Sequence, residues 1–221
     1  MVELEDLSFT YPDGAFHLNV PALRIESGER VAVVGPSGTG KTTLLNLISG
    51  LIAPRTGRIT VDDTNVASLG EAARRSFRAH SIGFIFQDFA LLDYLTAREN
   101  ILYPYRITDL KFDRNVRVRA DELATTSGLS GKLDRRPGSL SQGEQQRVAI
   151  CRALLPAPSL ILADEATGNL DPANKIVILD LLFDHAAATN AAILAVTHDH
   201  DLLPRFDRVI DFTAFRAEAT T

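Results

Sequence analysis

Two kinds of apolar pattern occur along the chain. In residues 2–11, apolar side chains loosely alternate with polar ones at Val2, Leu4, Leu7, Phe9 and Tyr11, and the segment ends in the turn formers PDG at 12–14. The segment RITV at 58–61, followed by two aspartates, has the same character. Half-buried antiparallel strands that end in turns show such alternation. We therefore predict an antiparallel β subdomain in the N-terminal part of the chain.

Unbroken apolar runs form the second pattern. They occupy residues 31–34 (VAVV), 160–163 (LILA) and 193–196 (ILAV). Strands that are covered on both faces have this composition, which is typical of a parallel sheet flanked by helices. The pattern predicts an α/β core with a mostly parallel sheet.

The pattern changes between residues 88 and 136. Charged and polar residues crowd positions 109–122, and the apolar spacing there is helical. Pro137 and Gly138 mark the return to the core. We predict one domain over 1–221, in which residues 1–87 and 137–221 form the core with its antiparallel part and residues 88–136 form an inserted α-helical subdomain.

Composition narrows the classes of protein. A chain of 221 residues with 45% hydrophobic and 23% charged residues is typical of a globular domain with a sizeable core. A net charge of −5 argues against a dedicated nucleic-acid binder, which is usually basic. The one cysteine, Cys151, fits a reducing compartment and is expected to pack as a small buried residue.

Targeting signals are not evident in the sequence. The acidic start MVELED is unlike an export signal, which needs a basic start followed by an apolar run. The longest apolar stretches, such as 44–53 and 176–183, are shorter than the roughly 18 residues of a spanning helix. We expect a cytoplasmic chain that depends on another chain to span any membrane at which it works.

A glycine-rich loop, GPSGTGKT at 35–42, follows a predicted strand and opens a helix near Thr42. Such a loop turns backbone N–H groups toward phosphates, and the helix N-terminus adds partial positive charge. Lys41 would reach the β- and γ-phosphates of ATP, and Thr42 would ligate Mg²⁺. The alternative is a glycine-rich turn that binds nothing. The candidate nucleotide-contacting residues are Gly35, Ser37, Gly38, Thr39, Gly40, Lys41, Thr42 and Thr43.

A second motif, LSQGEQQR at 140–147, precedes a helix that we expect over 144–155, ending at Pro156. Ser141 and Glu144 have the spacing of a capping box, so a well-capped helix start is one interpretation. Residues 138–143 form a longer and conformationally freer segment at the start of the helix than a cap alone requires. The motif therefore supports a binding role in addition to capping.

Two acidic residues, Asp164 and Glu165, end the apolar run at 160–163. This places them at the C-terminal edge of the sheet, where ligands of open α/β sheets bind. Asp164 would hold Mg²⁺ and Glu165 would activate the attacking water. The alternative is a solvated acidic pair.

Together, and in this order, the motifs at 35–42, 140–147 and 160–165 resemble those of the nucleotide-binding subunit of ATP-binding cassette (ABC) transporters. The resemblance implies an ATPase that forms a homodimer, in which Ser141 and Gly143 contact the ATP bound by the opposite subunit. Three positions depart from the family pattern: Gln142 replaces the commonest glycine, Glu144 replaces glutamine, and Ala166 replaces the proline that usually follows the glutamate.

The same resemblance assigns roles to four other residues. Gln87, at the junction with the helical insert, would sense Mg²⁺ and the attacking water. His198, directly after the run at 193–196, would contact the γ-phosphate. Asp171, in the segment GNLD at 168–171, would face the opposite subunit while also capping a helix that starts at Pro172. Tyr11 would stack on adenine, or it is simply the last apolar residue of its strand.

Details of the segments 83–89 (GFIFQDF), 95–101 (LTARENI) and 168–171 resemble the lipoprotein-releasing, macrolide-exporting and cell-division cassettes. The resemblance implies an integral membrane partner, a peripheral location on the inner face of the cell membrane, and export or lipoprotein release as the function. A soluble ABC ATPase that acts on nucleic acid or ribosomes is the alternative, although the long coiled-coil insertions and tandem cassettes of such proteins are not found here. The apolar side chains of Phe89, Leu91, Leu92 and Tyr94 either pack into the helical insert or form a groove for a helix of the partner.

Overall fold

An antiparallel sheet with the strand order β2-β1-β4-β5 is formed by the N-terminal part of the chain. In this computed structural model, which describes residues 1–12, 14, 16–168 and 170–215, its strands are β1 (Val2–Thr10), β2 (His17–Ile25), β4 (Thr56–Val61) and β5 (Thr64–Asn65). The antiparallel strands predicted at 2–11 and 58–61 are confirmed. Sequence analysis missed β2, where Pro21 interrupts the alternation; an edge strand tolerates proline because one of its sides is unpaired. Asp13, in the predicted turn, lies outside the described residues.

The second sheet is parallel throughout and has the order β6-β7-β8-β3-β9. Its strands are β3 (Arg30–Val34), β6 (Ile82–Ile85), β7 (Leu160–Asp164), β8 (Ala192–Val196) and β9 (Arg208–Asp211). Every residue of β7 and β8 is buried, as their unbroken apolar runs predict. The register pairs Asp164 with Val196, so β7 and β8 end at the same edge.

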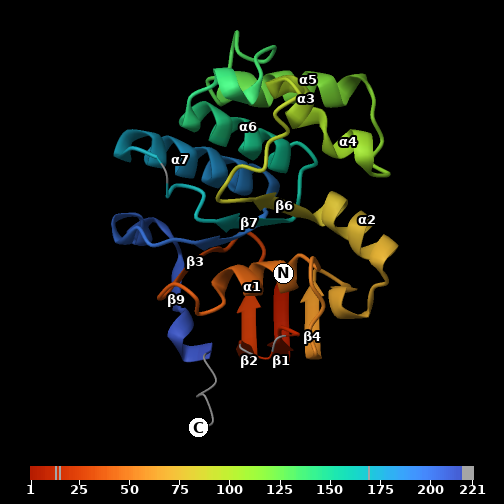
Figure 1. Cartoon of the computed structure of the whole chain (residues 1–221), viewed down its shortest axis with the longest axis vertical. Helices are drawn as coiled ribbons and strands as arrows, with labels where there is room; N and C mark the ends of the chain where they lie inside the picture. Colours follow the sequence, from red (N-terminus) through yellow and green to blue (C-terminus); the bar gives the residue numbers. More distant parts are fainter. Residues whose placement is uncertain (13, 15, 169, 216–221) are drawn as a thin grey trace.

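Helices cover both faces of the parallel sheet. Helix α1 (Lys41–Ile48) lies between the two sheets, where its apolar side chains join the core formed with the antiparallel strands (Figure 1). Helices α6 (Gln142–Leu154) and α7 (Pro172–Thr189) cover the opposite face. Short 3₁₀ turns follow at Val66–Ser68, Pro137–Ser139, His200–Arg205 and Phe212–Phe215. The α/β fold expected from the sequence, a parallel sheet with an antiparallel N-terminal part, is confirmed.

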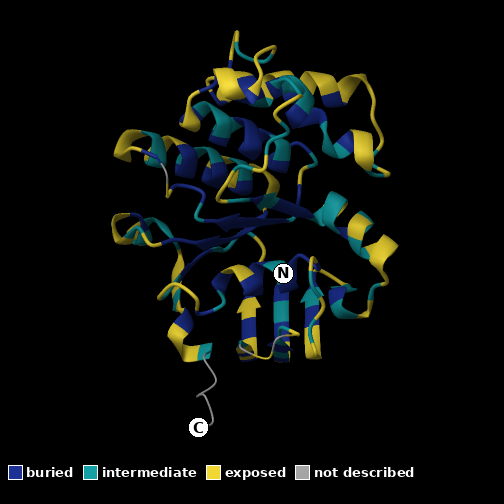
Figure 2. Ribbon diagram, viewed as in Figure 1, coloured by how far each residue is buried: buried dark blue, intermediate teal, exposed yellow. Residues whose placement is uncertain are grey.

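The remaining helices are α2 (Glu71–Ser81), α3 (Ala97–Leu102), α4 (Pro104–Ile107) and α5 (Arg114–Thr126). Helices α3 and α5 pack against α6 in a separate apolar cluster at the end of the molecule farthest from the antiparallel sheet (Figures 1 and 2). Cys151 is buried there, and burial raises the pKa of its thiol to about 11. Within the described residues, none of the helices combines the length and the apolar character that crossing a membrane requires.

Candidate nucleotide site

The phosphate loop connects β3 to α1 as its sequence predicts. Gly38 and Gly40 have φ angles of 77° and 102°, which L-residues with side chains rarely adopt. Gly40 is the N-cap residue of α1 and provides no side-chain cap, so the first backbone N–H groups of the helix remain available to a ligand. Thr39 is buried, and its hydroxyl donates to the carbonyl of Pro36 at 2.9 Å, which closes the loop.

Lys41 lies beneath this loop and is only 5% exposed. Its Nζ donates to the carbonyls of Gly35 and Pro36, each at 2.8 Å. Burial lowers the pKa of Lys41, while the nearby carboxylates of Glu165 and Asp164 act in the opposite direction. The ammonium is therefore held at the position where the loop would receive an anion.

The two predicted carboxylates have different surroundings. Asp164, the last residue of β7, is 8% exposed, and burial raises its pKa although the neighbouring Thr42 hydroxyl acts in the opposite direction. Glu165 leaves the strand with a φ of 50°, and its backbone N–H donates to the carbonyl of Val196 at 3.1 Å. At this turn the backbone leaves the strand direction, so the two neighbouring carboxylates lie in different surroundings.

His198 reaches Glu165 across the ends of β7 and β8. Its Nε2 lies 2.9 Å from Oε1 of Glu165. The contact depends on the register that places Asp164 beside Val196. A histidine next to a carboxylate beside a phosphate site can orient that carboxylate or exchange a proton with it.

These residues line a pocket of about 400 Å³ around the phosphate loop. It is formed by Tyr11, Phe16, Ser37, Gly38, Gly40, Lys41, Thr42, Thr43, Glu165, Val196 and His198. A second pocket of about 450 Å³ shares Glu165 and His198 and continues past Lys175 and Asp199. The structure thus brings together most of the nucleotide-contacting residues expected from the sequence.

Phe16 was not among the residues expected from the sequence. A Cβ added to Gly40 would lie 2.4 Å from Cζ of Phe16, so this ring packs directly on the phosphate loop. Tyr11 lies beside Phe16, with 5.8 Å between ring centroids, and its hydroxyl hydrogen-bonds Oγ1 of Thr43 at 3.1 Å. The feature of the sequence that could have identified Phe16 is that it is a second aromatic residue close after the turn at 12–14.

The motif at 140–147 lies apart from this pocket. Ser141 is the N-cap of α6, and both bonds of its capping box with Glu144 are present, at 3.3 and 2.9 Å. The helix begins at Gln142, two residues before the predicted start. Among the described residues, the lining of the two pockets includes neither Ser141 nor Gly143. Ser141 is exposed, as contact with another subunit would require.

Asp171 is the N-cap of α7 and also connects α7 to α6. Its carboxylate accepts from the backbone and the side chain of Asn174, at 3.1 and 2.5 Å, and these bonds lower its pKa. Asn174 in turn accepts from Arg147 at 3.0 Å. Asn169, in the same predicted loop, lies outside the described residues. Gln87 is exposed just after β6, and in the described part of the chain it does not line either of the two pockets.

Comparison with known proteins identifies the family. Residues 18–168 match the ABC transporter family. The chain belongs to the ABC transporter family. This cassette is 43% identical to the lipoprotein-releasing system ATP-binding protein LolD of Chromohalobacter salexigens, over 95% of this chain and 90% of its relative. It is 40% identical to the LolD protein of Cereibacter sphaeroides, over 98% of both chains.

A solved structure has a similar fold. It is a dimeric ATP-binding cassette in a post-hydrolysis state, bound to ADP and Pi, with a TM-score of 0.86 and 34% identity over 96% of this chain and 94% of that chain. The ABC cassette described here binds ATP and is an ATPase subunit of an ABC transporter. The alternative, a soluble ABC ATPase acting on nucleic acid or ribosomes, is not favoured.

Proposed function

We propose that this cassette is the ATP-hydrolysing subunit of a complex that releases lipoproteins from a membrane. The observation that carries the proposal is the 40–43% identity to two LolD proteins over at least 95% of the chain. A separate integral membrane subunit would bind the lipoprotein, and this chain would supply the energy of ATP hydrolysis.

The donor groups at the end of β7 fit Mg²⁺, which prefers oxygen ligands and keeps several of its waters. The hydroxyl of Thr42 lies close enough to Asp164 to lower the pKa of its carboxyl, and Thr42 lines the pocket at the phosphate loop. These two residues would hold the ion, with Gln87 completing the set. Bound there, Mg²⁺ neutralises charge on the β- and γ-phosphates.

The residues of the chain divide the remaining work. Lys41 and the loop residues Gly35, Ser37, Gly38, Thr39, Gly40 and Thr43 bind phosphates, and Tyr11 contacts adenine. Glu165 accepts a proton from the attacking water, and His198, 2.9 Å away, orients this carboxylate and contacts the γ-phosphate. General-base catalysis of this type contributes about 10²–10⁴ in rate.

One copy of the chain carries only half of the site. Ser141 and Gly143 lie outside the pocket that holds Lys41, yet Ser141 is exposed at the N-terminus of the 13-residue helix α6. In a homodimer, the 140–147 motif of each subunit, called the signature below, would complete the nucleotide site of the opposite subunit, and Asp171 would lie at the same interface. The dimeric form of the solved cassette supports this arrangement.

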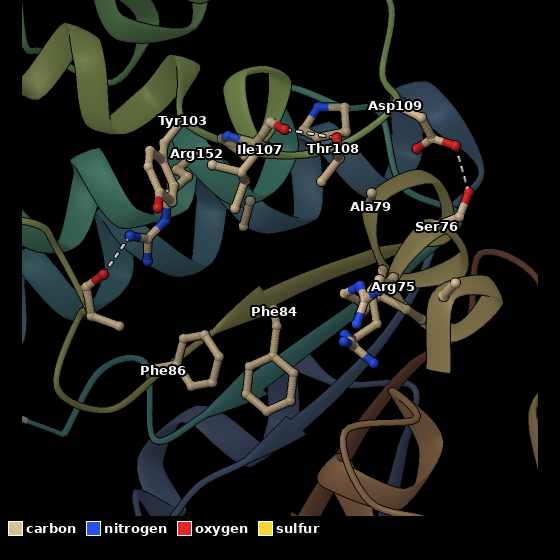
Figure 3. Close-up of a pocket in the computed structure, with 17 residues that line it drawn as sticks. Arg75, Ser76, Ala79, Phe84, Phe86, Tyr103, Ile107, Thr108, Asp109 and Arg152 are labelled. Atoms are coloured by element: carbon tan, nitrogen blue, oxygen red, sulfur yellow. Dashed lines mark hydrogen bonds between the residues drawn. The ribbon is translucent and has the colours of Figure 1, made fainter. Parts of the chain in front are cut away.

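A groove beside the core offers a docking site for the membrane subunit. It has a volume of about 660 Å³ and lies between α2, β6, α4 and the end of α6 (Figure 3). Phe84 and Phe86 stack at 4.3 Å on one side, and Ile107, which is 61% exposed, lies on the other. A short helix with an apolar face would fit such a groove. The helical subdomain at 88–136 would then move with the partner.

The loop that the sequence suggested for this groove contributes less than expected. Among the described residues of 89–94, only Ala90 lines the groove. Leu91 packs against the apolar cluster of α3, α5 and α6, and Tyr94 is 68% exposed. Docking on the membrane subunit through this groove would place the chain peripherally on the inner face of the cell membrane.

Reconstitution tests the proposed function. The cassette and its membrane subunits are placed in proteoliposomes loaded with a lipoprotein, and lipoprotein release is measured after ATP is added. The wild-type complex should release lipoprotein, whereas Glu165→Gln should retain ATP binding and lose nearly all hydrolysis and release. A complex that hydrolyses ATP normally but releases no lipoprotein would show that the cassette serves another transporter.

A further inference from the structure

Arg152 connects α6, the helix that begins in the signature, to the loop after Gln87 through side-chain hydrogen bonds. It lies in the last turn of α6, and its Nη1 and Nη2 donate to the carbonyls of Ala90 and Phe89, at 2.5 and 2.7 Å. Figure 3 shows the guanidinium beneath Tyr103, with one of these bonds drawn. A planar guanidinium can hold two neighbouring acceptors at fixed positions, which a lysine ammonium cannot do.

The two carbonyls belong to residues with an unfavourable backbone conformation. Phe89 and Ala90 have φ angles of 63° and 46°, and neither is glycine. The left-handed region costs an L-residue about 1–2 kcal/mol. The turn itself contains two backbone bonds, from Phe89 N–H to Phe86 at 3.2 Å and from Ala90 N–H to Asp88 at 2.7 Å. A conformation of this kind persists only where surrounding groups enforce it.

Arg152 is the surrounding group that contacts this turn directly. Burial lowers its pKa to about 10, and Asp88 is the acidic residue that acts in the opposite direction. Burying a guanidinium is costly unless its N–H groups donate hydrogen bonds, and the carbonyls of Phe89 and Ala90 accept them here. The bonds therefore constrain the loop and the arginine mutually.

The far end of the loop is fixed independently. Asn100, which is fully buried, accepts from the Leu92 N–H at 2.8 Å and donates to the Leu92 carbonyl at 3.1 Å. Leu92 is anchored from α3, and within the described residues the hydrogen bonds of Arg152 from α6 hold the preceding segment at Phe89 and Ala90. That clamp is two residues from Gln87.

We propose that Arg152 is a positioning residue that holds the 87–90 turn and thereby fixes where Gln87 lies after β6. Arg152 also lines the groove, so a partner helix docked there would contact the group that sets the position of Gln87. The signature helix, the Gln87 loop and the groove would thus share one side chain. The inference rests on the proposed roles of Gln87 and of the groove.

A double-mutant cycle tests whether Arg152 acts through Gln87. In the reconstituted complex, Arg152→Ala should lower kcat about tenfold with less than about a twofold change in the KM for ATP. If Gln87 transmits the effect, Arg152→Ala should not lower kcat further in a Gln87→Ala background, because coupled residues are non-additive. Arg152→Lys should recover little, since the paired geometry is lost.

Arg78 provides a matched control. It also lines the groove and donates to a backbone carbonyl, that of Gly50 at 2.9 Å, and burial lowers its pKa as well. It does not contact the 87–90 turn in the described structure. The double variant with Arg78→Ala and Gln87→Ala should therefore have a kcat lowered by the product of the two single-variant factors.

A glycine substitution separates positioning from general destabilisation. Ala90→Gly removes the penalty at a φ of 46°, so Arg152→Ala with Ala90→Gly should recover several-fold of the lost kcat. Melting temperatures of all variants are measured to identify unfolding. This inference is overturned, and the proposed role of Gln87 is not, if the effects of Arg152→Ala and Gln87→Ala on kcat multiply and Ala90→Gly restores no activity. Wild-type kcat in Gln87→Ala would overturn both the proposed role of Gln87 and this inference.

Discussion

Asp164 is a buried carboxyl at the end of β7, and its burial affects the stability of the folded protein. Burial is the largest influence on it and raises its pKa above the ordinary 3.8. Its folded form therefore binds a proton more tightly than its unfolded form does. The stability of the protein consequently falls as pH rises from 3.8 to this raised pKa, and the cost is fully present at neutral pH.

We therefore expect Asp164→Asn to stabilise the nucleotide-free protein. The amide has nearly the same size and shape as the carboxylate but carries no buried charge. At pH 7 without Mg²⁺ or ATP, the melting temperature should rise by roughly 2–4 °C while ATPase activity is lost. The gain should shrink as the pH falls below this raised pKa, because Asp164 then becomes protonated in the folded wild type. A lower melting temperature at pH 7 would contradict this account.

At the scale of elements, helices α3 and α6 both begin with a capping box. Thr96 and Glu99 form a capping box at the start of α3, as Ser141 and Glu144 do at the start of α6. Capping alone explains the spacing of Ser141 and Glu144 in the sequence, and the structure contains that cap. The proposed contact of Ser141 with the opposite subunit is a separate property of the same hydroxyl.

Alanine substitutions distinguish the two roles. Ser141→Ala and Thr96→Ala should each cost about 1 kcal/mol of stability, because each removes a helix cap. Only Ser141→Ala should also reduce ATP-dependent dimerisation and turnover, measured by size-exclusion chromatography and phosphate release at a temperature where both variants are folded. Equal turnover losses in the two variants would mean that Ser141 only caps its helix.

At the scale of the whole molecule, the proposed nucleotide site combines residues from two copies of the chain. Lys41→Ala removes the phosphate loop lysine of one copy, and Ser141→Arg blocks the signature of the other. Mixed dimers of the two variants contain one intact loop facing one intact signature, so mixing should restore ATPase activity that each variant lacks alone. Heterodimers that form but remain inactive would argue against head-to-tail pairing.

The groove for the membrane subunit can be tested separately. Ile107→Asp places a charge on an exposed residue that lines the groove, so it should leave basal ATP hydrolysis intact and abolish stimulation by the membrane subunit. Val118→Asp is the matched control, because Val118 is 48% exposed on α5 and does not line the groove. Equal stimulation of the two variants would place the docking surface elsewhere.

Local motifs of the chain were readable from the sequence because their conformations depend on short-range geometry. The glycines at 38 and 40 require positive φ, and Asp171 before Pro172 starts α7 where the pair predicts. The apolar runs also predicted β3, β7 and β8, since a strand covered on both faces needs them. These segments were sufficient for the fold class, the family and most of the candidate site.

Only the tertiary structure decided which distant residues meet. The 2.9 Å contact of His198 with Glu165 follows from the parallel register of β7 and β8, and Phe16 reaches Gly40 because β2 lies in the sheet below α1. The clamp of Arg152 on Phe89 and Ala90 joins positions about sixty residues apart. No local pattern encodes such pairs, because they depend on strand order and helix packing. The sequence therefore determined the chemistry of the groups, and the packing of the whole chain determined which of them act together.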